Sequence, residues 1–546
     1  MKSTLGSVIG KVYSNIERRY KFCFFSAVIC ALMAHLYAMT NHLYNYDELW
    51  HTPTGFGTGV EVGRWALSIT VWIQKVVFLN CFTIPLINGL ISIILYSLTA
   101  CLVVSVLDIR DELYAAICGA LMTTFPALVC RMFFMFTTHY YAIGLVLAAL
   151  GAWLMVRRGT SVPFTALSLM LITYGMAIYQ ANFVTAVCML AGALLIDLIR
   201  NDIDLKSAIL KALRYVLYLG ACMVMFLIGS KIALKVTGKQ METYENLDTM
   251  GRISIPQLIT ALSQCYKTFF KTPFKYVYSM NPNIIVRATF LICILLLAYT
   301  FVKVLMSSKD ISIKLLICLI ICILPVAVNL IIIMAISSGT MYSIMVYEIV
   351  FEFLIPLACL NAIGDGALPS KGKDISFLYL PLTQKISLHR LIDVISSLAL
   401  ICTVLTYIWF ANGNYLALEY TNDHDNAYFT ALMTQVKSLE GYREGMPVAL
   451  VGKIDEYSIA DTRHSMIGDS FNIGGKSDSN LGAYSYWNIM TRVIGFDPLI
   501  LNSDEEEEYF GNHAEVKEMP SYPNDGSIRI IDDTVVIKFG EYEPAP

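Results

Sequence analysis

The sequence predicts a polytopic α-helical membrane protein with about eleven transmembrane helices and a small C-terminal α/β domain. Hydrophobic residues make up 56% of the 546 residues and charged residues only 15%, and the mean hydropathy is +0.61. Soluble globular chains usually contain about 45–50% apolar and about 25% charged residues. This composition excludes a water-soluble globular protein, a disordered chain and a basic nucleic-acid-binding protein.

Apolar segments long enough to cross a bilayer recur along the first 411 residues. A transmembrane helix needs roughly 20 predominantly apolar residues. Three prolines, Pro126, Pro325 and Pro356, fall inside or at the ends of such segments, where neighbouring helices can satisfy the freed backbone groups. The candidate spans lie near residues 22–40, 83–105, 112–129, 136–156, 163–180, 183–199, 213–235, 284–305, 313–335, 342–363 and 391–411.

Lys and Arg gather in the short segments on one side of these spans, beginning with the N-terminal segment that contains Arg18 and Arg19. Cytoplasmic loops carry such an excess of basic residues, so we expect a cytoplasmic N-terminus. An odd number of spans then exports the C-terminus. The chain divides into a transmembrane domain at 1–411, with exported loops at 41–82 and 236–283, and an exported α/β domain at 412–546.

The exported domain differs from the rest of the chain in charge and in cysteine content. It holds 23 acidic and 9 basic residues, and all 14 cysteines lie outside it. This excludes a disulfide-stapled domain and a thiolate metal site there. We expect a helix over 421–441, a strand over 447–451, and a hairpin over 527–539 that turns near Asp532-Asp533. The acidic run 504–508 is expected to be a solvated loop, with a calcium role as the alternative.

Two adjacent carboxylates, Asp47 and Glu48, follow the first span by only a few residues. A carboxylate beside a bilayer is partly desolvated, which favours a raised pKa and a usable general base. The alternative is that Asp47 caps a short helix and Glu48 is solvated. Segment 61–80 has apolar residues at helical spacing and is predicted to be a helix that lies in the membrane interface. Its spaced residues are Trp65, Ile69, Trp72, Ile73 and Val76.

This arrangement resembles a known family. A first span, an exported loop with an acidic pair, and a Gly63-Arg64-Trp65 element are similar to the integral-membrane glycosyltransferases of the GT-C fold. Within them, the chain most resembles the bacterial glucosyltransferases that modify O-antigen during serotype conversion. Residues 174–182 are similar to the Tyr-Gln element of that group, and residues 522–528 and 535–538 resemble its C-terminus. The resemblance covers the whole chain in layout, although each motif is short.

The resemblance implies an inverting hexosyltransferase of the bacterial inner membrane. Such enzymes move a sugar, usually glucose from undecaprenyl phosphate glucose, to a glycan on the periplasmic side, here the O-antigen of lipopolysaccharide. The partners implied are the polyprenyl-phosphate donor, the glycan acceptor and membrane lipids, with no cofactor and no nucleic acid. The role of base falls to Asp47 or Glu48, and we favour Asp47. A metal site formed by these two residues with His42 and His51 is the alternative.

A lipid phosphate at the interface needs Arg or Lys. Relatives commonly place an arginine at the outer end of a late span, where this chain has no arginine in residues 338–342. The candidates to replace it are Arg64, Arg131 and Lys231, and the alternative for each is snorkelling to the headgroups. Residues 255–279 are expected to form a second interfacial helix. Further substrate-binding candidates are Tyr46, Trp65, His139, Tyr140, Tyr179, Gln180 and Lys538.

Two acids inside the tenth span, Glu348 and Glu352, are four residues apart and are expected to share one helical face. Ionisable residues inside a membrane are costly, so they suggest a functional role by default. A structural role, or a position in the wall of the site, is the alternative. In a transporter or flippase for a lipid-linked sugar they would be coupling residues. We see no internal repeat and no pair of broken helices, which such transporters often have. A third possibility is a non-enzymatic scaffold for envelope assembly.

Overall fold

The structure is a computed structural model, and it divides the chain into two units. It describes residues 14–78, 80–201, 203–242, 254–271, 283–335, 341–368, 377–379, 385–452, 488–496, 499–501 and 504–542. The first unit, here called the membrane unit, comprises Met1–Thr40 and Phe56–Asn412. The second, the tail unit, comprises Asn41–Gly55 and Gly413–Pro546.

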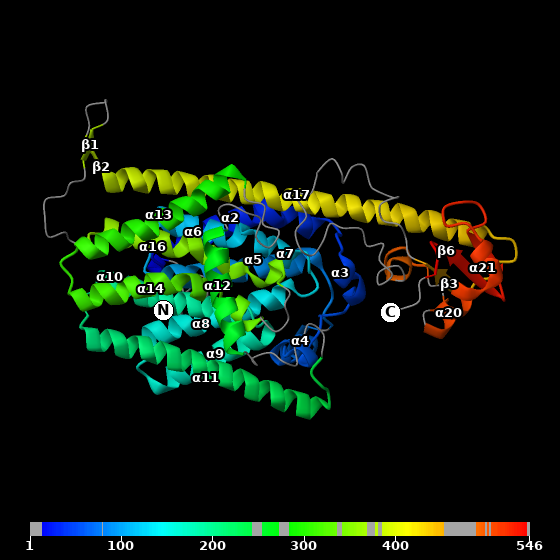
Figure 1. Cartoon of the computed structure of the whole chain (residues 1–546), viewed down its shortest axis with the longest axis horizontal. Helices are drawn as coiled ribbons and strands as arrows, with labels where there is room; N and C mark the ends of the chain where they lie inside the picture. Colours follow the sequence, from blue (N-terminus) through cyan, green and yellow to red (C-terminus); the bar gives the residue numbers. More distant parts are fainter. Residues whose placement is uncertain are drawn as a thin grey trace, which may run out of the picture. The chain divides into compact units, whose positions relative to one another are not determined.

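Long apolar helices run alongside one another in the membrane unit (Figure 1). Among the described residues, nine helices are long and apolar enough to cross a membrane, which confirms a polytopic helical membrane protein. They are α2 (Arg18–Thr40), α5 (Pro85–Val106), α8 (Thr138–Arg158), α10 (Asn182–Arg200), α11 (Leu205–Thr237), α13 (Ile284–Met306), α14 (Ile311–Val328), α16 (Phe351–Gly364) with the preceding 3₁₀ turn η4 (Tyr347–Val350), and α17 (Leu388–Ser438).

Two further expected spans take other forms. Helices α6 (Glu112–Thr124) and α7 (Pro126–Met132) make a tenth span if the pair, bent by 45°, is counted as one. The bend falls where Pro126 forces the preceding Phe125 out of the helical region. Helix α9 (Val162–Ile178) is apolar but has only 17 residues. The count of eleven spans therefore stays a prediction.

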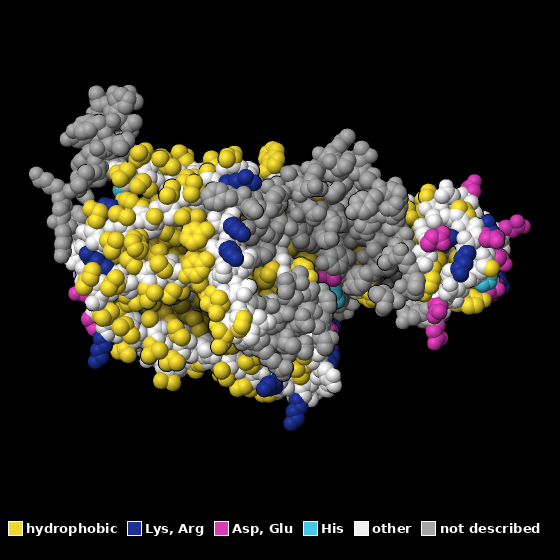
Figure 2. Space-filling model, viewed as in Figure 1, with side chains coloured by type: hydrophobic (Ala, Val, Ile, Leu, Met, Phe, Trp, Pro, Cys, Tyr) yellow, Lys and Arg dark blue, Asp and Glu magenta, His cyan; other side chains and the backbone are white. Residues whose placement is uncertain are grey.

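Small residues allow close packing between the helices. Helix α2 lies against α5 and α6, and a Cβ at Gly119 of α6 would overlap the Cys23 carbonyl oxygen of α2. Such small-residue contacts are typical of helix pairs in membranes. Away from these contacts the surface of the helical body is largely apolar (Figure 2), as a lipid-facing surface requires. On α2, small buried residues follow one another at helical spacing: Cys23, Ala27, Ala31, Ala34 and Ala38.

Shorter elements complete the membrane unit. Helix α4 (Trp65–Phe78) confirms the predicted helix and leaves apolar side chains such as Trp72 and Val76 exposed. Helix α12 (Ile255–Lys271) confirms the helix predicted over 255–279 as far as that segment is described, and residues 272–279 lie outside the described part. The remaining elements are η1 (Val60–Val62), α15 (Leu330–Met334), η3 (Ser343–Met345), and the hairpin of β1 (Phe377–Tyr379) and β2 (Lys385–Ser387).

The tail unit contains a four-stranded sheet of order β4-β3-β6-β5. β3 (Pro447–Val451) is parallel to β4 (Leu499–Leu501) and to β6 (Thr534–Lys538). β5 (Ile528–Ile531) and β6 form the predicted hairpin, with Asp532 and Asp533 both at positive φ, as a tight two-residue turn requires. The other elements are α3 (Tyr46–His51), η6 (Ile489–Val493), α20 (Asp504–Asn512) and α21 (Ala514–Glu518).

Two predictions for the tail need correction. The helix expected over 421–441 is confirmed up to Ser438, but it is not separate from the last span, because α17 runs without interruption from Leu388 to Ser438. The acidic run 504–508 is not a loop but the first half of α20. Acidic side chains in a first helical turn are stabilised by the helix dipole, and the buried Phe510 anchors the helix to the sheet.

Candidate active site

Arg64 lies in the membrane unit at the turn between η1 and α4. Its guanidinium sits 5.1 Å from the ring centre of Tyr179 and 6.0 Å from that of Tyr141. Its Nη1 donates to the Tyr141 hydroxyl over 3.4 Å. Gln180 holds the turn by donating to the Val62 carbonyl oxygen over 2.7 Å. The sequence candidates Arg64, Tyr179 and Gln180 are thus brought together.

No carboxylate among the described residues pairs with Arg64, and its buried Nε has no hydrogen-bond partner there. The nearby acid of the same turn, Glu61, is instead bonded to Lys239. Partial burial acts to raise the pKa of Glu61, but the hydrogen bond and charge of Lys239 hold it below its ordinary value. Glu61 is therefore ionised and paired with Lys239 rather than with Arg64.

Arg131, on α7, lies against the same Tyr179 ring, 5.4 Å from its centre. It is fully buried, unlike the half-buried Arg64. Its Nη1 donates to the Tyr96 hydroxyl over 3.3 Å, and its Nε donates to the Ile344 carbonyl oxygen over 3.2 Å. Its Nη2 lies 3.9 Å from Oε1 of Glu348. The protein itself thus supplies partners to the charge of Arg131.

The two acids of the tenth span, expected on one face of a continuous helix, lie in two different helical elements. Glu348 lies in η4, and Glu352 lies in the first turn of α16. Glu348 accepts a hydrogen bond of 2.8 Å from Thr185 as well as facing Arg131. Glu352 is buried with Asn329 as its polar neighbour. The backbone departs from the α-helix over 342–350, and the two carboxylates consequently have different surroundings.

The other candidates of the membrane unit lie in three places. Trp65 stands edge-on to Tyr174, with ring centres 6.2 Å apart. The rings of His139 and Tyr140 lie with their centres 3.9 Å apart and their planes tilted by 40°, and both side chains reach Gln74 of α4, at 3.4 and 2.8 Å. Lys231 is exposed on α11. In the described part of the chain, no hydrogen bond, ion pair or ring contact joins these side chains to Arg64.

The acidic pair lies on α3, in the tail unit. Oδ1 of Asn45 caps this helix by accepting from the backbone amides of Asp47 and Glu48, each at 2.9 Å. The reading in which Asp47 is the cap is therefore wrong, and so is the reading in which Glu48 is solvated, because its side chain is only 2% exposed. Asp47 is half-buried and is the more accessible of the two. The Tyr46 side chain lies outside the described part.

His51 ends the same helix. Burial, together with the positive charge of Arg492, lowers the pKa of His51 to about 4. The imidazole is therefore neutral at physiological pH. The alternative metal site is not formed: no group of three or more His, Cys, Asp or Glu side chains in the described parts of the chain is placed to hold a metal ion.

Lys538, the tail candidate, is buried in β6. Its Nζ donates to the Lys517 carbonyl oxygen over 3.1 Å and lies 2.9 Å from the Glu541 carboxylate. Both contacts tie the end of the sheet to its neighbours. A contact of Lys538 with substrate stays a prediction.

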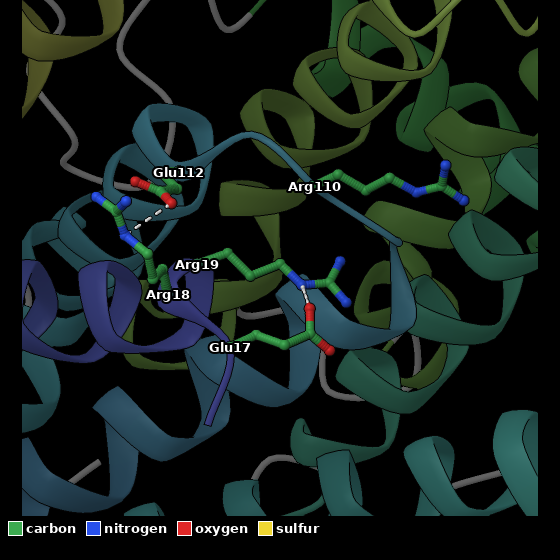
Figure 3. Close-up of a pocket in the computed structure, with 5 residues that line it drawn as sticks. All are labelled: Glu17, Arg18, Arg19, Arg110 and Glu112. Carbon is green, nitrogen blue, oxygen red and sulfur yellow. Dashed lines mark ion pairs between the residues drawn. The ribbon is translucent and has the colours of Figure 1, made fainter. Parts of the chain in front are cut away.

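The membrane unit also contains a cavity of about 360 Å³ (Figure 3). It lies where α2 and α6 begin. Its arginines are matched by carboxylates: Arg18 with Glu112 at 3.1 Å, Arg19 with Glu17 at 2.7 Å, and Arg110 with Asp108 at 2.8 Å. These ion pairs hold helix ends together and leave no surplus charge for an anionic substrate. We assign no part of the reaction to this cavity.

Sequence reasoning missed several residues around the two arginines. Tyr96, Tyr141 and Tyr347 surround them, and Thr185 holds Glu348. Tyr141 adjoins the predicted pair His139-Tyr140, so its position was a usable signal. Tyr96 and Thr185 lie within long apolar segments, and no spacing in the sequence connects them to Arg131.

Comparison with known proteins assigns the family. The family model of the GtrII glucosyl transferases matches residues 36–353, which is more than half of the chain. No curated protein and no solved structure matches the chain. The matched range contains the acidic pair and both arginines, and it confirms the resemblance to the serotype-conversion glucosyltransferases. The chain belongs to the GtrII glucosyl transferase family and is a membrane glycosyltransferase.

Proposed function

We propose that this protein transfers glucose from a polyprenyl-phosphate carrier, undecaprenyl phosphate glucose, to a hydroxyl of a surface glycan such as O-antigen. The transfer takes place on the exported face of the bacterial inner membrane and inverts the anomeric carbon. The observation that carries the proposal is Arg64, a partly accessible guanidinium with no carboxylate partner among the described residues. Such a group suits a lipid phosphate at the membrane surface.

The chemistry requires a base and a means of stabilising the leaving phosphate. The acceptor oxygen attacks the anomeric carbon from the face opposite the phosphate, so the new C–O bond forms as the old one breaks. The hydroxyl proton passes to Asp47, the more accessible of the two acids. The electron pair of the broken bond leaves with the phosphate, whose charge Arg64 offsets.

The transporter and scaffold alternatives are less well supported. The family is one of glucosyl transferases. Glu348, which a transporter would use for coupling, is instead bonded to Thr185 and faces Arg131. These contacts favour a structural role for Glu348.

The test is transfer in detergent by the purified full-length protein, with glycan acceptor and one of two donors. We expect transfer from polyprenyl phosphate glucose and none from a nucleotide-activated glucose. The anomeric configuration of the product, read by NMR, should be opposite to that of the donor. Transfer from the nucleotide sugar without any polyprenyl lipid, or retention of configuration, would contradict the proposal.

A further inference from the structure

The acidic helix α3 is built into the tail unit, although it follows the first span in the chain. Asn422, on α17, binds the backbone on both sides of Tyr44: the Tyr44 amide donates to Asn422 Oδ1 over 2.9 Å, and Asn422 Nδ2 donates to the Tyr44 carbonyl oxygen over 2.8 Å. Both residues are buried, Asn422 at 4% and Tyr44 at 3% exposure. A side-chain amide carries both an acceptor oxygen and a donor NH2, so it can pair with the amide and the carbonyl of one residue as a neighbouring strand would.

This contact fixes the entry to α3. Tyr44 immediately precedes Asn45, whose side chain caps the helix through the amides of Asp47 and Glu48. The Tyr44 hydroxyl also donates to Asn426, one turn further along α17, over 2.6 Å. Asp47 thus follows Tyr44 by three residues, and α17 holds Tyr44 at its amide nitrogen, its carbonyl oxygen and its hydroxyl.

The other end of α3 is fixed by the tail as well. Arg492 donates through Nη1 to the carbonyl oxygens of Trp50 and Thr52, the latter at 2.7 Å. A cation at a helix C-terminus satisfies carbonyl groups that the helix leaves unpaired. Between the two ends, Leu49 is 2% exposed and belongs to the same hydrophobic cluster as Phe429 and Met433 of α17.

We propose that Asn422 is a positioning residue for the transfer reaction: it sets the placement of α3, and through it of Asp47. The inference rests on the proposed role of Asp47 as the base. Asn422 lies beyond residues 36–353, the range matched by the family model. The tail unit therefore contributes to the reaction by holding the helix that carries the base, and the matched range alone does not contain everything that places it.

The test measures kcat and donor KM for full-length variants in the transfer assay. Asn422→Ala removes the clamp, and Asn422→Asp keeps the acceptor but loses the donor. We expect kcat to fall by roughly 10²-fold for Asn422→Ala, since small misplacements of a reacting group have effects of this order. Asn422→Asp should lose at least as much, because it sets a buried carboxylate against the Tyr44 carbonyl oxygen. Donor KM should stay unchanged in both. Gln435→Ala, which removes an exposed amide on the same helix, should behave as the parent.

A double-mutant cycle with Asp47→Asn separates positioning from general destabilisation. If Asn422 acts through Asp47, the double variant should be no slower than Asp47→Asn alone. Losses that multiply, or an Asn422→Ala variant with parental kcat beside an inactive Asp47→Asn, would overturn the positioning role. An active Asp47→Asn variant would instead overturn the base assignment in the proposed function.

Discussion

Arg64 and Arg131 lie against one tyrosine ring but are suited to different tasks. Arg131 is fully buried and has Tyr96, the Ile344 carbonyl and Glu348 around it. Arg64 is half-buried, and its Nε lacks a hydrogen-bond partner among the described residues. A donor phosphate gains most from a charge that the protein has not already neutralised. We therefore expect Arg64 to contact the phosphate and Arg131 to support the Tyr179 ring that it lies against.

The two arginines should respond differently to substitution. Arg64→Ala should leave the thermal stability of the protein nearly unchanged and raise donor KM by roughly 10–100-fold, the value of a hydrogen bond to a charged group. Arg131→Ala should destabilise the protein by about 3–5 kcal/mol, because Glu348 is left buried without its partner. Thermal unfolding in detergent and donor titration measure the two effects. Equal loss of stability in both variants would contradict this division.

The two acids of α3 should also differ. Asp47→Asn keeps the shape of the side chain but cannot accept the hydroxyl proton, so we expect a loss in kcat of about 10²–10⁴-fold. Glu48→Gln should lose less, because Glu48 is buried and cannot reach an acceptor hydroxyl as readily. Transfer rates and folded yield are measured together. Near-parental rates for both variants and for the double variant would show that α3 does not carry the base.

His51 gives the tail unit a dependence on pH. Its pKa is about 4 in the folded protein against about 6.5 ordinarily, so the unfolded chain binds the extra proton between these values. Stability from the neutral imidazole is present above about pH 6.5 and is lost as pH falls towards about 4. The fall in melting temperature across this window should be smaller in His51→Gln than in the parent. His42→Gln, exposed on the same segment, is the control and should match the parent.

At the scale of elements, the turn from η1 into α4 requires a glycine. Gly63 has a φ of +79°, a conformation that L side chains rarely adopt, and a Cβ there would lie 3.1 Å from Nε2 of Gln180. The turn leads directly into Arg64. The bond from Gln180 to the Val62 carbonyl oxygen closes it from the other side. The position of Arg64 thus depends on Gly63 and on Gln180.

Gly63→Ala should therefore impair the reaction as well as the fold. Left-handed backbone costs an L residue about 1–2 kcal/mol, and the crowding of Gln180 should displace Arg64 and raise donor KM. Gly366→Ala is a matched control, because Gly366 has a similar φ of +78° but open space around its Cα. It should lose stability to the same extent with donor KM unchanged. An equal rise in donor KM for both variants would remove the link between the turn and Arg64.

Local patterns predicted most elements, and long-range contacts account for the failures. The helix α4, the strand β3 and the hairpin β5–β6 follow from periodicity and turn residues over a few positions. The continuity of α17 could not be predicted in this way, because polar residues around Asn414 resemble a helix end until their partners are known. The clamp of Asn422 on Tyr44 joins positions 378 residues apart. No spacing within one sequence reports such a contact.

For the whole molecule, the side of the membrane reached by the C-terminus depends on whether α9 spans. Its 17 residues extend about 26 Å, slightly less than the roughly 30 Å of a typical hydrocarbon core. A short span is accommodated by local thinning of the bilayer at modest cost. Arg157 and Arg158, at the end of α8, favour a cytoplasmic position for the turn before α9. With α9 and the α6–α7 pair both spanning, the acidic tail is exported.

Reporter fusions test this arrangement directly. A phosphatase, active only outside the cytoplasm, should be inactive when fused after Gly159 and active after Gln180 and after Pro546. A reporter active only in the cytoplasm should give the reverse pattern at the same three positions. Fusions after Gly159 and Gln180 that report the same side would show that α9 does not cross, and a cytoplasmic C-terminus would then follow from the even count.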